Sequence, residues 1–105
     1  MKIKTIDVCA KEWWDKVNGN SYFSGRITTN FGMKDKETLF MPFQYGYYNQ
    51  YEWKAMKMLV EKYHKRFEGY EKSPLWRFCQ EKGIILRTSI DKNCKKHEVV
   101  EFGVK

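Results

Sequence analysis

Residues 21–43 read SYFSGRITTNFGMKDKETLFMPF, and this stretch decides the expected fold. Its first half is rich in aromatic and β-branched residues, which favour a β-strand. Residues 32–36 form a polar turn and residues 37–43 return as a second strand, so the stretch predicts a β-hairpin. Gly25 inside the first strand indicates a β-bulge or a close backbone approach. Pro42 lacks an amide hydrogen, so the second strand either ends there or lies at a sheet edge.

The segments on either side of this hairpin complete the expected secondary structure. Residues 10–17 place apolar side chains at helical spacing, and Gly19 suits the left-handed position that follows a helix. Ser73 and Pro74 are typical of a helix start, and Gly83 is typical of a helix end. The expected elements are a strand at 2–8, a helix at 10–17, strands at 21–31 and 37–43, helices at 50–67 and 74–82, and strands at 84–90 and 97–102. This β-α-β-β-α-α-β-β order favours an α+β fold, a mainly antiparallel sheet with two or three helices on one face.

The composition bounds the class of protein. With 105 residues the chain has room for a single domain, residues 1–105. Apolar residues make up 42% and charged residues 31%, a balance that excludes collagens and disordered tails. No stretch approaches the roughly 20 apolar residues of a membrane helix, and the N-terminus has no signal-peptide core. We therefore expect a cytoplasmic protein without a membrane partner, and the sequence leaves its oligomeric state open.

The positive charge is concentrated in the second half of the chain. Residues 1–53 carry seven Lys/Arg and six Asp/Glu, a net of +1, whereas residues 54–105 carry thirteen and seven, a net of +6. Lysine and arginine bind the phosphates of nucleic acids and release counterions. The candidates are Lys54, Lys57, Lys62, Lys65 and Arg66 on the main helix and Lys92, Lys95 and Lys96 at the expected last hairpin. The alternative is an ordinary solvated surface, because acidic residues are interspersed.

Aromatic residues make up 17% of the chain, and a cluster of tyrosines has no place on an obvious core stripe. Exposed rings beside cations stack on the bases of single strands. The candidates are Tyr45, Tyr47, Tyr48 and Tyr51 in the segment before the main helix, together with Tyr22 in the hairpin. The same rings could instead anchor a protein interface, whereas Trp13, Trp14, Phe78 and Phe102 are expected to fill the core.

Residues for catalysis or for metal binding do not form a recognisable set. The chain has two histidines, His64 and His97, and only the Cys94-x-x-His97 pair has ligand-like spacing. A structural zinc ion normally takes four such ligands, and a nucleophile pair needs a third orienting group. Lys95 and Lys96 could lower the pKa of the Cys94 thiol. We expect no enzyme, no metal and no cofactor, with Cys9 and Cys79 as reduced thiols in the core.

Residues 5–60 contain a series of segments with aromatic residues and glycines, namely Trp13–Trp14, Asn18–Ser24, Pro42–Tyr47, Tyr51 and Ala55. They follow the pattern WF…NGN(S/T)Y…PFxYGYG…Y. In this pattern about half of the chain resembles a group of small proteins from bacteriophages and mobile elements to which no activity is assigned. Tyr48 stands where the pattern has glycine, and Trp14 where it more often has phenylalanine. The resemblance implies an accessory protein that acts inside a bacterial cell.

Two functions of different classes are consistent with these observations. The favoured one is a small, basic, non-enzymatic protein that binds nucleic acid, single-stranded or without strong sequence preference. The alternative is a stoichiometric modulator of a host protein, such as a defence or replication factor.

Overall fold

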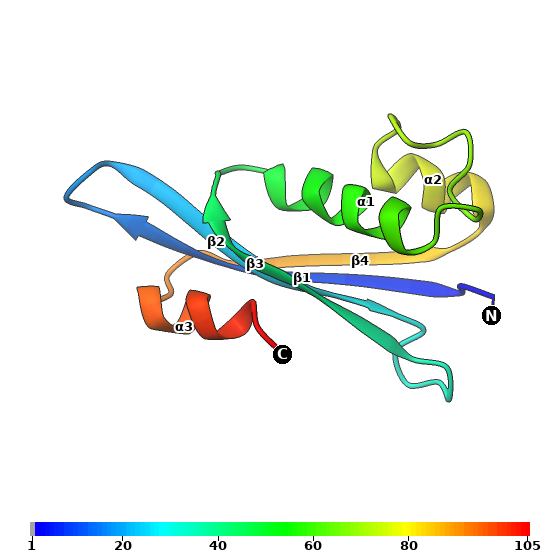
Figure 1. The fold of residues 1–105 in the computed structure, drawn as a ribbon, viewed down its shortest axis with the longest axis horizontal. Helices are drawn as coiled ribbons and strands as arrows, with labels where there is room; N and C mark the ends of the chain where they lie inside the picture. Colours follow the sequence, from blue (N-terminus) through cyan, green and yellow to red (C-terminus); the bar gives the residue numbers. More distant parts are fainter. Residues whose placement is uncertain (1) are drawn as a thin grey trace.

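The computed structural model describes residues 2–105 and contains one four-stranded sheet with three helices. The elements are β1 (Thr5–Asp15), β2 (Asn20–Thr29), β3 (Glu37–Tyr45), α1 (Gln50–Lys62), α2 (Leu75–Lys82), β4 (Ile85–Asp91) and α3 (Lys96–Phe102). The strand order across the sheet is β3-β2-β1-β4. Figure 1 shows α1 and α2 on one face of this sheet and α3 on the other. The fold is therefore α+β, as the sequence predicts.

The topology follows from the directions of the strands. β1 pairs with β2 and β2 with β3 in antiparallel fashion, whereas β4 pairs with β1 in parallel. β3 and β4 therefore run in the same direction at opposite edges of the sheet. A connection between such strands must cross the sheet, and α1 and α2 make this crossing. Two helices on one face match the expectation, and α3 is an addition on the opposite face.

The hairpin at residues 21–43 is confirmed in detail. β2 and β3 pair from Tyr22 opposite Tyr45 to Thr29 opposite Glu37, and their register shifts between Phe23 and Gly25. This shift is the bulge that the glycine indicates. An added Cβ at Gly25 would lie 3.0 Å from the Cys9 carbonyl oxygen, so the backbones also approach closely. Pro42 lies in β3, which is an edge strand, and a missing amide donor is tolerated there.

The helix expected at residues 10–17 is wrong, because this segment continues β1 as far as Asp15. Trp13 pairs with Tyr22 and Trp14 with Ser21, so the neighbouring tryptophans point to opposite faces of the sheet. Val17, the last member of the supposed helical stripe, is 92% exposed in the turn. Gly19 does adopt a positive φ of 69°, but it closes a hairpin and not a helix. Cross-strand pairing over the whole length of β2 outweighs the local helical spacing.

The strand expected at residues 97–102 is also wrong, because these residues form α3. The Lys95 amide donates a hydrogen bond to Glu98 Oε1 at 2.8 Å, which helps to start the helix. Val99 is fully buried against the sheet, and the Ser24 hydroxyl donates a hydrogen bond to its carbonyl oxygen. Arg26 Nε donates to the Phe102 carbonyl oxygen at 3.0 Å, so a cation satisfies the end of the helix.

The main helix begins at Gln50 as expected but ends at Lys62, five residues earlier than predicted. After the C-cap Tyr63 the chain continues in a series of turns. These turns lead to Phe67, whose ring is fully buried and stacks on Phe78 of α2 with ring centroids 4.0 Å apart. α2 ends at Gly83 in the left-handed conformation, as predicted.

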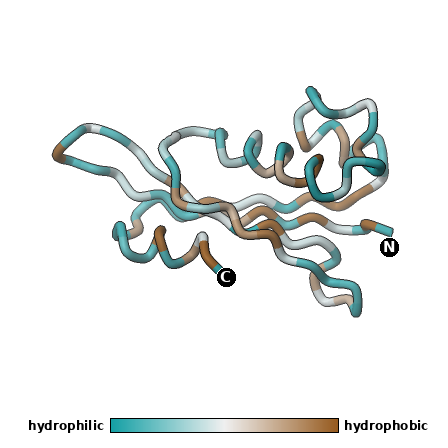
Figure 2. The backbone as a smooth tube through the Cα atoms, viewed as in Figure 1, coloured by the Kyte–Doolittle hydropathy of each residue, from teal (hydrophilic) through white to brown (hydrophobic). Residues whose placement is uncertain are grey.

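The core lies between the sheet and the two crossing helices. Ile6, Val8 and Ala10 alternate along β1 with side chains on the other face, and they pack beneath α1. Ala55, Met56 and Leu59 supply the buried stripe of α1, all at most 2% exposed. Figure 2 shows hydrophobic residues along the central strands and hydrophilic ones in the connections around α2. Within residues 2–105, no helix is long and apolar enough to cross a bilayer.

Candidate functional site

A continuous series of aromatic contacts runs across one end of the sheet. We call it the aromatic ladder; it consists of Trp13, Tyr22, Phe43, Tyr45, Tyr47 and Tyr48. Tyr22 stacks between Trp13 and Phe43, at centroid distances of 5.6 and 5.1 Å. Trp13 and Phe43 form a tilted pair at 6.4 Å. The contacts of Tyr45, Tyr47 and Tyr48 are edge-to-face pairs at 5.5 to 6.0 Å. Distances and angles of this kind are favourable for aromatic pairs, so the rings support one another.

The ladder passes around the edge strand from one face of the sheet to the other. Trp13 and Tyr22 are cross-strand partners on the face that carries α3. Tyr45 ends β3, and its ring touches Tyr22 on one side and Tyr47 on the other. Tyr47 and Tyr48 lead on to the start of α1, on the opposite face. The rings therefore form a curved rim and not a flat patch.

The exposed members of the ladder are Tyr45, Tyr47 and Tyr48. Their side chains are 57%, 46% and 81% exposed. Tyr48 has a positive φ of 59°, which is uncommon for a bulky residue. The neighbouring Tyr47 is the main cause that raises the pKa of Tyr45. A phenol with its ordinary pKa near 10 is already neutral at neutral pH, so Tyr45 does not repel a phosphate.

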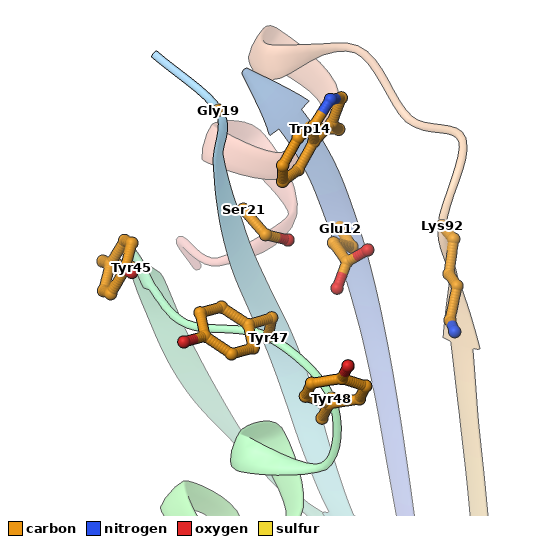
Figure 3. A pocket seen from close by; sticks show the side chains of 8 residues that line it. All are labelled: Glu12, Trp14, Gly19, Ser21, Tyr45, Tyr47, Tyr48 and Lys92. Atoms are coloured by element: carbon orange, nitrogen blue, oxygen red, sulfur yellow. The ribbon is translucent and has the colours of Figure 1, made fainter. Parts of the chain in front are cut away.

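A hollow opens where the β1–β2 hairpin extends past the start of α1. We call it the hairpin hollow; it has a volume of about 420 Å³, and its lining includes Glu12, Trp14, Ser21, Tyr47, Tyr48 and Lys92. Figure 3 shows Glu12 and Ser21 on the strands at its floor, with the two tyrosines on one side and Lys92 on the other. Volumes of this size are typical of small-molecule sites. The hollow combines rings, a carboxylate, a hydroxyl and a cation.

A second hollow, which we call the helix groove, lies along α1 on the side of the edge strand. It has a volume of about 310 Å³, and Trp53, Lys54 and Lys57 of α1 line it together with Tyr45. Tyr45 lines the hairpin hollow as well, so the two hollows meet at this ring. Trp53 is 49% exposed, which adds a further ring to the surface.

The eight predicted cations do not form one surface. Lys54 and Lys57 line the helix groove and Lys92 lines the hairpin hollow. Lys96 lies on the α3 face, where its Nζ is 5.5 Å from the centroid of the Trp13 ring. Lys95 precedes α3 and is exposed.

The remaining predicted cations lie away from the ladder, near the C-terminal end of α1. Lys65 and Arg66 line a separate hollow together with Lys2 and Lys82. Lys62 is in the last turn of α1 and is exposed. None of these three residues lines the hairpin hollow or the helix groove.

Tyr51 lies in the core, which removes it from the candidate rings. It is 8% exposed, and burial raises the pKa of its phenol. As the second residue of α1 it faces the sheet, whereas the preceding tyrosines are still in the loop. Tyr51 and Ala55 are four residues apart, so they share one face of a helix. The sequence alone could therefore have predicted that Tyr51 is buried with Ala55.

The cysteines differ from the expectation at two positions. Cys9 is exposed on the sheet and is not a core residue, because its neighbours in β1 take the buried face. Burial and a hydrogen bond to the Asp91 carbonyl oxygen raise the pKa of Cys94, although the sequence suggests that the lysines lower it. Cys79 is buried as expected, and burial raises its pKa to about 12. In residues 2–105, no three His, Cys, Asp or Glu side chains are placed to hold a metal ion.

Several residues of the ladder and the hollow were not expected there. The sequence assigns Trp13 and Trp14 to the core, yet Trp14 is 52% exposed and Trp13 lies in the ladder. Glu12 and Ser21 gain their place only through strand pairing, because Glu12 lies opposite Phe23 and Ser21 opposite Trp14. Recognition of Asn18–Gly19–Asn20 as a hairpin turn would have brought these residues together.

No protein-family model, curated protein or solved structure matches this chain.

Proposed function

We propose that the protein is a non-enzymatic accessory protein that binds single-stranded nucleic acid at the aromatic end of its sheet. The observation that carries this proposal is the row of exposed tyrosines between two hollows that contain lysines. Stacking on aromatic rings together with cations that hold the backbone is the usual means of binding single strands without strong sequence preference.

The geometry offers a path for several nucleotides. Lys92 lies on one side of the ladder, and Lys54 and Lys57 lie on the other, in the helix groove. A strand that follows Tyr48, Tyr47 and Tyr45 would pass from the first cation to the other two. The curved rim favours a flexible single strand, because a duplex keeps its bases stacked internally and cannot offer them to the rings.

The resemblance to proteins of phages and mobile elements is consistent with this proposal. Its pattern includes Trp13–Trp14 and Pro42–Tyr47, and these two segments contain four of the six members of the aromatic ladder. Action inside a bacterial cell stays a prediction of that resemblance.

Fluorescence anisotropy with labelled 12-residue oligonucleotides tests the proposal. Binding should be measurable at about 50 mM salt and weaken steadily as salt rises, with a slope near +2 in log Kd against log salt for about three phosphate contacts. The charge-reversed variant Lys57→Glu should bind less tightly and show a shallower slope. Lys34→Glu, on the exposed turn between β2 and β3, is the matched control. Absence of binding at 50 mM salt would overturn the proposal.

A modulator of a host protein is the second candidate, and a surface that shares Trp53 with the helix groove supports it. Trp53 and Trp76 are 49% and 59% exposed and line one small hollow between α1 and α2. Tryptophan is enriched at the centres of protein interfaces. A pull-down from a bacterial lysate, run with and without nuclease, separates the two functions. A protein partner that persists after nuclease and is lost in Trp76→Ala would favour this second function.

A further inference from the structure

The Ser21 hydroxyl is a buried polar group without a partner. Ser21 is 3% exposed, and its Oγ makes no hydrogen bond within residues 2–105. Its backbone carbonyl accepts a hydrogen bond from the Gly46 amide at 3.0 Å, so the strand position is fixed while the side chain stays unpaired. Buried hydroxyls are nearly always hydrogen-bonded, and an unpaired one at the floor of a hollow points to a ligand.

Glu12 places an unpaired carboxylate beside this hydroxyl. Among residues 2–105 the two ion pairs are Arg77–Glu81 and Arg87–Asp7, so Glu12 has no cation within 4.0 Å. Its side chain is half-buried, and Figure 3 shows the carboxylate and the Ser21 hydroxyl directed toward the same space. An ionised carboxylate only accepts hydrogen bonds, so it favours a ligand that donates them. It also repels phosphate from the floor of the hollow.

Aromatic side chains surround these two polar groups. Trp14 borders the hollow on the hairpin side, and Tyr47 and Tyr48 border it on the side of α1. Lys92 lies at the rim, across from the tyrosines. A ligand that fits this arrangement has a planar ring, a donor group at one edge of the ring and a negative charge outside the hollow.

We propose that the hairpin hollow holds one unstacked base of the bound strand and selects bases that carry an exocyclic amino group. This inference rests on the proposed single-strand binding and adds base selectivity to it. The Glu12 carboxylate accepts from the amino group, the Ser21 hydroxyl pairs with a neighbouring ring atom, and Lys92 contacts the phosphate. Carboxylates pair with the cytosine amino group in known complexes. Thymine and uracil present a carbonyl oxygen at the same position, which the carboxylate repels.

Cytosine and thymine oligonucleotides provide the decisive comparison, because both bases are pyrimidines of similar size and stacking area. We expect the wild-type protein to bind a labelled dC 12-mer at least about fivefold more tightly than a dT 12-mer at neutral pH. In Glu12→Gln the side-chain amide can donate as well as accept, so the difference should shrink to within about twofold. The change should come mainly from tighter binding of the dT strand.

Two further variants and one competition complete the experiment. Glu68→Gln makes the same change of charge in an exposed turn beyond α1 and should keep the full preference for dC. Ser21→Ala should weaken binding of dC about two- to fivefold and leave dT nearly unchanged. Competition of the wild-type complex with CMP and with UMP needs no variant, and CMP should displace the strand at lower concentration.

The outcomes separate this inference from the proposed function. Equal binding of dC and dT by the wild-type protein, or a preference that persists in Glu12→Gln, would overturn the base selectivity and leave single-strand binding intact. Failure to bind any oligonucleotide would overturn both. Circular dichroism of each variant, matching the wild-type spectrum and melting point, shows that a lost preference is not a lost fold.

Discussion

The two ends of the sheet use aromatic residues in opposite ways. At the end covered by α1 and α2, Phe67 and Phe78 are fully or almost fully buried, and Tyr70 meets Phe78 edge-to-face at 5.1 Å. At the other end, Tyr45 and Tyr48 are more than half exposed although they also touch neighbouring rings. Ring contacts alone therefore do not define the core of this protein. Coverage by a helix decides which rings stabilise the fold and which remain available to a ligand.

Truncation of a buried ring should have the largest effect. Phe78→Ala removes a side chain that is 2% exposed and stacked on Phe67, which leaves a cavity beneath α2. We expect the free energy of unfolding to fall by about 3–5 kcal/mol, a large part of the stability of a domain of this size. Urea unfolding followed by tryptophan fluorescence measures this loss.

The matched control for Phe78 is its neighbour on the same helix. Trp76 is 59% exposed, so Trp76→Ala should change the free energy of unfolding by no more than about 0.5 kcal/mol. If Phe78→Ala and Trp76→Ala lowered the free energy of unfolding by similar amounts, the distinction between the buried and the exposed ring of this helix would be incorrect.

At the open end, removal of a ring should affect binding and not stability. Tyr48→Asn takes away a side chain that is 81% exposed, and asparagine tolerates the positive φ of this position better than alanine does. We expect affinity for a single-stranded oligonucleotide to fall by about 1–3 kcal/mol, the value of one stacked base. The urea midpoint should remain within error of the wild type.

An exposed ring far from the ladder tests whether this effect is local. Phe31 is 64% exposed and follows β2, at the end of that strand opposite the β1–β2 turn. Phe31→Ala should leave oligonucleotide affinity unchanged. A comparable loss in both variants would indicate general hydrophobic contact with the strand and not a defined row of rings.

The same contrast shows what the sequence could predict. The central hairpin, its bulge at Gly25 and the two crossing helices were predictable because turn residues and apolar periodicity agree locally. Residues 10–17 were not, because their helical spacing competes with pairing to a strand whose position only the tertiary fold determines. Residues 97–102 are similar, since two adjacent valines suit either a short helix or a strand.

The candidate site was predictable only in part for the same reason. The sequence predicts one loop that contains Tyr45, Tyr47 and Tyr48, so their exposure could be anticipated, although Tyr45 is the last residue of β3. Glu12 and Ser21 come from two different strands, and one of them lies in a segment with a misleading pattern. A site whose residues come from two strands can be predicted only when the pairing register of those strands is known. The β1–β2 register follows from the turn between them, and here that turn was interpreted as the end of a helix.

The buried thiol at the covered end should make stability depend on alkaline pH. Burial raises the pKa of Cys79 to about 12 in the folded state, whereas an unfolded cysteine titrates near 8.5. Between these values the unfolded chain releases a proton that the folded chain keeps, so stability present below about pH 8.5 declines as pH rises. From pH 8 to pH 10, wild type should lose about 2 kcal/mol more than Cys79→Ala in urea unfolding. Equal losses in both proteins would show that other groups cause the alkaline effect.

The smallest effect on stability is expected from an ion pair on the sheet face opposite α1 and α2. Arg87 of β4 pairs with Asp7 of β1 through two hydrogen bonds, at 2.6 and 3.0 Å, on the face that carries α3. Their side chains are 54% and 19% exposed, so water and salt screen much of the attraction. A double-mutant cycle with Arg87→Met and Asp7→Asn should give a coupling of about 0.5–1 kcal/mol at low salt and less at 1 M salt.

Since β1 and β4 are also joined by their hydrogen-bond ladder and by the core beneath α1, the pair adds to a contact that burial already determines. A coupling above about 2 kcal/mol that resists salt would mean that this face is as well shielded as the core, and the contrast between the covered and the uncovered surface would fail there.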